Sequence, residues 1–126
     1  MTQVLDFARV RLLAAALAAG VLMAAAPAQA GGNVERGQAK AAQVCAACHA
    51  VNGDWNKTLQ PEYPQLAGQH YDYLVTVLNA YKQGDKSVIG RKNAVMVPMA
   101  KALSRQDIED VAAFLSKQPG DLRVRH

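Results

Sequence analysis

The amino-acid sequence predicts a small all-α domain, and two observations support this prediction. Three segments have helical signals, through helix-forming residues in the first and apolar residues at helical spacing in the other two, and no segment alternates apolar and polar residues as a strand would. The chain has 126 residues. This length favours one domain, because two domains of half the size would each be too small to hold a core unaided.

Residues 1–30 have the pattern of a secretory signal peptide. Two arginines precede fifteen apolar or glycine residues at positions 12–26, and a proline and the small-x-small motif Ala28-Gln29-Ala30 follow. We therefore expect cleavage after Ala30, a periplasmic protein and no membrane span in the cleaved chain. An uncleaved anchor is the alternative, although a spanning helix usually needs about 20 apolar residues.

The charge of the remaining chain excludes some classes of protein. Residues 1–30 contain two arginines and one aspartate, so the formal charge of +4 falls to +3 for residues 31–126. This value does not fit a strongly basic nucleic-acid binder, and the composition does not fit a multi-pass membrane protein. A domain of this size has a small core, which is often supplemented by a disulfide, a metal or a cofactor.

The first two predicted helices cover residues 34–48 and 70–83. The first is rich in helix-forming residues and has Asn33 as its N-cap. The second is expected to stop at Gly84. Its apolar face repeats at i, i+3, i+4 and i+7 and consists of Leu74, Val77, Leu78 and Tyr81.

The third predicted helix covers residues 104–118. Ser104 and Asp107 have the spacing of a capping box at its start, and Pro119 and Gly120 close it. Its apolar face has the same spacing as that of the second helix and consists of Ile108, Val111, Ala112 and Leu115.

Two connections of twenty residues each, 50–69 and 84–103, are unusually long for a compact domain. They are too apolar to be disordered. We expect them to wrap around a large apolar group that the chain itself does not supply. Their large apolar residues are Trp55, Tyr63, Leu66, Val88, Ile89, Val95, Met96, Val97 and Met99.

The motif Cys45-Ala46-Ala47-Cys48-His49 indicates what this group is. Cysteines three residues apart on a turn present two thiols to the two vinyl groups of one haem, and the adjacent histidine can bind the iron. In an exported chain this pattern favours haem c, covalently attached through Cys45 and Cys48 and ligated by His49.

Three other interpretations use the same residues. A thioredoxin-like dithiol would need a βαβ unit, which the pattern does not contain. A zinc site would need a further ligand, for which His70 and His126 are available. A disulfide between the two cysteines would close a short, strained loop.

The second axial position of the iron has candidates in the second long connection. Met96 and Met99 both lie there, and His/Met ligation raises the reduction potential and suits electron transfer. His70 is a rival ligand. Arg91 and Lys92 are candidates to pair with the haem propionates; a solvated loop is the alternative. The residues alone give no role to Trp55.

The chain resembles a class I c-type cytochrome, and in particular one half of the dihaem bacterial cytochromes of the c-four group. The resemblance spans residues 33–118 and implies a domain of three main helices and two long loops around one haem, at 31–118, followed by a short tail at 119–126. The matching motifs are ERGQAK ahead of Cys45-x-x-Cys48-His49, YPQLAGQ at 63–69, GRK at 90–92, Met96-x-x-Met99 and LSRQDIEDVAAF from Leu103.

The resemblance also implies roles for single residues. Met96 matches the axial methionine, whereas Met99 matches a neighbouring methionine that does not bind iron. Pro64 matches the proline whose backbone carbonyl accepts a hydrogen bond from the haem-ligating histidine, and Leu66 is expected at the haem edge. Gly37 matches the glycine at which the first and last helices cross.

Together these observations predict an electron-transfer protein and not an enzyme. We expect a monohaem cytochrome that carries single electrons between redox partners whose identity the sequence does not specify. Two alternatives remain at this point. The chain can be a cytochrome subunit of a dehydrogenase or oxidase complex, or a haem protein with an open iron that binds small ligands.

Overall fold

The computed structural model describes residues 31–88 and 91–121, and this part of the chain is helical. Its only strand-like pairing is an isolated bridge between Val51 and Asp54. The all-α prediction is therefore confirmed. The elements are α2 (Val34–Val44), α3 (Ala46–His49), α4 (Tyr71–Gln83), the 3₁₀ helix η1 (Gly84–Lys86), α5 (Met96–Lys101) and α6 (Arg105–Ser116). The predicted signal peptide and residues 122–126 of the predicted tail lie outside the described residues.

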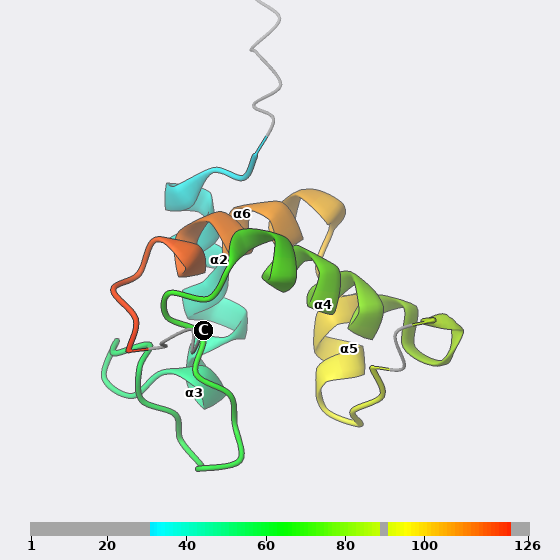
Figure 1. Ribbon diagram of the computed structural model, residues 1–126, viewed down its shortest axis with the longest axis horizontal. Helices are drawn as coiled ribbons and strands as arrows, with labels where there is room; N and C mark the ends of the chain where they lie inside the picture. The colour runs from blue at the N-terminus through cyan, green and yellow to red at the C-terminus, as the bar shows by residue number, and fades with distance from the viewer. Residues whose placement is uncertain (1–30, 89–90, 122–126) are drawn as a thin grey trace, which may run out of the picture.

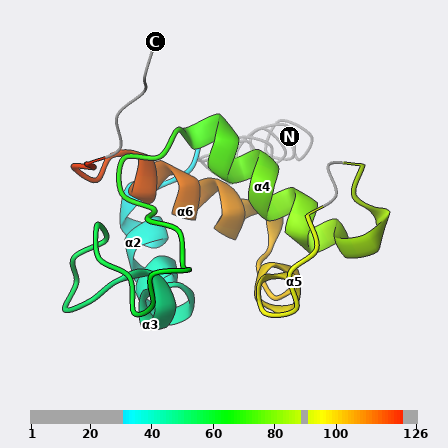
Figure 2. The same cartoon turned by 60° about the horizontal axis from the view of Figure 1, so that its bottom comes forward.

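Helix α6 lies at the centre of the arrangement. It packs against α2 on one side and α4 on the other, and α5 packs against α4. Both views show α3 and α5 on the same side of the layer formed by α4 and α6, near its two ends (Figures 1 and 2). Among the described helices, none has the length and hydropathy needed to cross a bilayer.

The core is built mainly from α6. The four residues of its predicted apolar face, Ile108, Val111, Ala112 and Leu115, are each at most 1% exposed. Trp55 is buried too, and its ring meets that of Phe114 edge to face, with centroids 5.6 Å apart and an interplanar angle of 81°. Packing of the first long loop onto the core is therefore a role for Trp55.

The predicted helix at 34–48 is in fact two helices. α2 ends at Val44, and α3 starts at Ala46. The backbone of Cys45 has φ −103°, away from the usual helical value near −63°. Its carbonyl accepts from both the Cys48 and the His49 amides, at 3.2 and 3.0 Å. The helix is therefore interrupted by a turn residue at the first cysteine.

The second long connection contains a helix that the sequence pattern does not predict. Oδ1 of Asn93 accepts from the amides of Val95 and Met96, each at 2.9 Å, and so starts α5. Pro98 is the third residue of α5, where a missing N–H costs no intrahelical bond. Six residues are too few for apolar periodicity to identify a helix.

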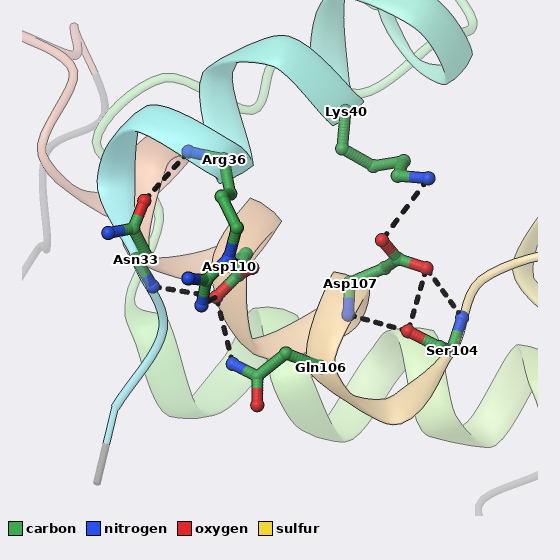
Figure 3. A network of polar contacts seen from close by, with 7 residues as sticks. All are labelled: Asn33, Arg36, Lys40, Ser104, Gln106, Asp107 and Asp110. Carbon is green, nitrogen blue, oxygen red and sulfur yellow. Dashed lines mark hydrogen bonds and ion pairs between the residues drawn. The ribbon is translucent and has the colours of Figure 1, made fainter. Parts of the chain in front are cut away.

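The predicted helix ends are otherwise close to those observed. Asn33 caps α2, and Ser104 and Asp107 form a complete capping box at the start of α6 (Figure 3). Gly84 ends α4 with φ +59°, a conformation that favours glycine. Beyond α6, the Asn56 side chain donates to the Pro119 carbonyl at 2.9 Å, which holds the start of the predicted tail against the first long loop.

A buried carboxylate joins α2 to α6. Asp110 of α6 accepts from the Asn33 amide at 2.6 Å, from Nε of Arg36 at 2.7 Å and from the Gln106 side chain at 2.9 Å (Figure 3). Burial alone raises the pKa of Asp110, but the bonds from Arg36, Asn33 and Gln106 outweigh it and lower the pKa to about 2. Nearby, Lys40 pairs with Asp107 at 3.2 Å.

Gly37 allows the close approach of these two helices. A Cβ atom at this position would lie 1.9 Å from the carbonyl oxygen of Asp110 and 2.9 Å from Cβ of Phe114. Neither neighbour can yield without moving the backbone of α6. The helix crossing expected at Gly37 is therefore present, and it requires glycine.

Replacing Gly37 tests this crossing. We expect Gly37→Ala to lower the free energy of unfolding by about 2 kcal/mol or more, because α2 must move away from α6. Urea unfolding of the haem-loaded protein measures the change. Gln38→Ala creates the same residue at the next, exposed position of α2 and should shift stability by less than about 0.5 kcal/mol. Equal stability of Gly37→Ala and the unmutated protein would contradict the interpretation.

The low pKa of Asp110 predicts a pH dependence of stability. The pKa is about 2 in the folded chain and about 3.9 when unfolded. The stabilisation is therefore present above about pH 4 and is lost as the pH falls towards about 2. We expect it to be on the order of 1–2 kcal/mol, because Arg36 is 59% exposed and screening weakens the pair. Urea unfolding at several pH values should show a smaller acid loss in Asp110→Asn, and an identical loss would contradict the assignment.

Candidate functional site

The turn between α2 and α3 carries the two cysteines and the histidine of the motif. Both cysteines are free and half-buried, so no disulfide joins them. Burial raises the pKa of the Cys45 thiol to about 11. A thiol with this pKa is protonated at neutral pH, unlike the activated cysteine of a dithiol oxidoreductase.

The described residues do not assemble a zinc site around this turn. Within 31–88 and 91–121, no three His, Cys, Asp or Glu side chains come together as a metal ion would require. His70 is exposed at the start of α4. His126, the other candidate, lies outside the described residues.

His49 is buried and held in one orientation. His49 is 6% exposed, and its Nδ1 lies 2.9 Å from the carbonyl oxygen of Pro64. A carbonyl can only accept, so Nδ1 is the donor and the neutral ring keeps the lone pair on Nε2. The Tyr63 ring lies beside the imidazole, with centroids 6.0 Å apart.

The other ring nitrogen of His49 is available to a ligand. Among the described residues Nε2 makes no hydrogen bond, and no fully buried side-chain nitrogen or oxygen there lacks a partner. Nε2 is therefore accessible at the protein surface, although most of the imidazole ring is buried. A nitrogen fixed in this way has the right protonation state to bind a metal.

Local hydrogen bonds hold the loop that carries Pro64. The Gln65 side chain donates to the Asn56 carbonyl at 2.7 Å, and the Gly68 amide donates to the Leu115 carbonyl at 3.0 Å. The Leu59 amide donates to the Cys48 carbonyl at 3.0 Å, which joins the same loop to the motif. Leu66 is half-buried and packs against the hydrophobic core that contains Trp55 and Phe114.

The two candidate methionines differ in their surroundings. Met96 is the first residue of α5 and is half-buried, whereas Met99 is exposed. α5 and the histidine-bearing α3 lie on the same side of the α4–α6 layer (Figure 2).

Arg91 and Lys92 already have protein partners. Nη2 of Arg91 donates to the Tyr73 hydroxyl at 3.1 Å, and the guanidinium lies 6.0 Å from the ring centroids of both Tyr73 and Tyr81. Hydrogen bonding to Tyr81 and Tyr73 raises the pKa of Arg91. Lys92 pairs with Asp85 at 3.4 Å.

The residues around the motif fit a haem group. Two free thiols and an available imidazole nitrogen lie on one turn, as covalent haem attachment requires. Large apolar side chains are exposed on both long connections: Leu59, whose amide donates to the Cys48 carbonyl, is 59% exposed, and Val95, which precedes α5, is 58% exposed. A small helical domain with these features belongs to the class of proteins that bind haem covalently.

The chain belongs to the cytochrome c family, whose model matches residues 34–119. It therefore carries covalently bound haem c, and its family is one of electron-transfer proteins. It is 42% identical over 99 residues to cytochrome c4 of Stutzerimonas stutzeri, covering 75% of this chain and 45% of that protein. It is 43% identical over 74 residues to cytochrome c-554(548) of Halomonas halodenitrificans, covering 59% of this chain and 83% of the relative.

A solved structure supports the same fold. The crystal structure of reduced recombinant cytochrome c4 from Pseudomonas stutzeri matches with a TM-score of 0.60 and 41% identity, over 72% of this chain and 48% of that one. The chain thus spans about half the length of the cytochrome c4 proteins that it matches. The resemblance to one half of the c-four cytochromes and the class I fold are confirmed.

Covalent attachment predicts a simple extraction result. Protein matured in a haem-c-competent periplasm should keep its colour through acidic organic extraction, and the double variant Cys45→Ala/Cys48→Ala should lose it, because no thioether remains. Ala47→Ser changes the exposed position between the cysteines and should keep the colour. Colour retained in the double variant would contradict attachment at these thiols.

Proposed function

We propose that this protein is a monohaem cytochrome that carries single electrons in the periplasm, with His49 and Met96 as axial ligands of the iron. The observation that carries the proposal is the buried His49, whose Nδ1 is held by Pro64 while Nε2 stays available beside two free thiols. When bound, the haem supplies an iron that accepts and returns one electron.

The residues of this chain would fix that group in place. Cys45 and Cys48 hold it through thioether bonds, which also keep His49 next to the iron. The Pro64 carbonyl oxygen accepts a hydrogen bond from Nδ1 of His49, at 2.9 Å. This bond sets the tautomer and the ring orientation and raises the basicity of Nε2.

Met96 is favoured over Met99 as the second ligand on structural and family grounds. Met96 is the more buried of the two, and its amide is held by Asn93 at the start of α5. It also matches the axial methionine of the family. With both axial positions filled by protein, no open position remains for a substrate or gas, which suits a carrier.

We propose a periplasmic location because residues 1–30 have the pattern of a signal peptide. Cleavage after Ala30 would remove the apolar stretch at 12–26, so we expect no membrane span in the cleaved chain. We propose redox proteins of the same compartment as donor and acceptor. The small formal charge of +3 on residues 31–126 argues against strong long-range steering by net charge.

The ligand assignment is tested by the weak ferric methionine-to-iron charge-transfer band in the near-infrared. We expect the band in the unmutated protein and in Met99→Ala, and its loss in Met96→Ala, because only Met96 supplies the sulfur ligand. Met99→Ala is a matched control on the same helix.

Carbon monoxide binding gives an independent readout. The ferrous unmutated protein should bind carbon monoxide slowly, and ferrous Met96→Ala should bind it rapidly. Rapid binding of carbon monoxide by the unmutated protein would contradict the proposed electron-carrier function and would support an iron with an open axial position.

A further inference from the structure

The segment that carries Met96 is too short to hold its own position. α5 has six residues, and isolated helices shorter than about 12 residues are marginal in water. Its place must therefore come from its neighbour, and α5 packs against α4 (Figure 2). Two charged side chains make polar contacts between α4 and the chain on either side of Met96.

Lys82 of α4 makes the first tether. Lys82 is half-buried, and its ammonium donates to the Lys101 carbonyl at 3.3 Å and also to the Leu103 carbonyl. These acceptors lie at the end of α5 and just beyond it, where helix carbonyls lack intrahelical partners. A positive charge also interacts favourably with a helix C-terminus.

Arg91 makes the second tether, on the other side of Met96. It lies five residues before Met96 and reaches back to α4 by donating to the Tyr73 hydroxyl at 3.1 Å. Its guanidinium also lies 6.0 Å from the ring centroids of Tyr73 and Tyr81, within the range of a cation–π contact.

We propose that Lys82 and Arg91 are positioning residues that hold the Met96 segment on α4 and thereby set how readily Met96 leaves the iron. This inference rests on the proposed ligation by Met96. Each tether favours the arrangement in which α5 is docked. Loss of a tether increases the fraction of molecules in which the second axial position is free, and the apparent affinity for a competing ligand rises in proportion.

Imidazole binding to the ferric haem-loaded protein measures this fraction. We expect Lys82→Met to raise the imidazole affinity about tenfold, equivalent to about 1.4 kcal/mol, and to weaken the methionine-to-iron band. Lys82→Arg keeps the charge and N–H donors and should keep the unmutated values to within about twofold. Arg91→Gln tests the second tether separately and should also raise the affinity.

The control is the same substitution at a lysine that joins other helices. Lys40 of α2 pairs with Asp107 of α6, so Lys40→Met removes an interhelical contact without touching α4 or α5. It should change the imidazole affinity by less than about twofold. An equal rise in Lys40→Met and Lys82→Met would overturn the proposal, because it would show a general loss of stability.

Failure of this inference is distinguishable from failure of the proposed ligation. An unmutated protein that shows the methionine band, with Lys82→Met and Arg91→Gln both at unmutated affinity, overturns the tethers alone. Absence of the band, together with an imidazole affinity that Met96→Ala does not change, overturns the ligation and the tethers together.

Discussion

The approach of α2 to α6 at Gly37 is the constraint on which the rest of the structure depends. With no side chain at this position, the backbone of α2 lies against that of Asp110, and the buried carboxylate can then bind Asn33 and Arg36. α2 leads directly into the turn at Cys45, so the crossing decides where His49 lies. The same α6 supports α4, and α4 supports α5. Both proposed ligand segments are thus positioned from one helix.

The loop at 50–69 is held against the rest of the domain without regular secondary structure. Trp55 packs into the core against Phe114, the Gly68 amide bonds to α6, and the Leu59 amide bonds to the Cys48 carbonyl. Between these contacts, Pro64 presents its carbonyl to His49. Loops that serve a function are often held in this way by a rigid scaffold. The haem-binding motif and the loop therefore form one unit, in which the loop orients the histidine that the helix supplies.

The parts of the structure that can be predicted from the sequence are those with a local sequence pattern. Periodicity locates α4 and α6, the Ser104 capping box locates the start of α6, and the cysteine spacing locates the haem site. α5 is too short and the turn at Cys45 too local for periodicity to detect. Asn93 and Pro98 are the local sequence signal for the start of α5. The contacts of Trp55 with Phe114 and of Lys82 with Leu103 join distant segments, so no local pattern could indicate them. The carbonyl of Pro64 was expected only from the family resemblance.

The bond between Asn33 and Asp110 joins residues 77 positions apart, and this separation has a consequence for folding. α2 and α6 lie near opposite ends of the domain, so they cannot pack on each other until almost all of the domain's chain is present. Until then α2 lacks its partner. Closing such a long loop costs entropy that only the finished core repays. The order of elements along the chain thus makes the support of the haem-binding turn depend on α6, the last of the described helices.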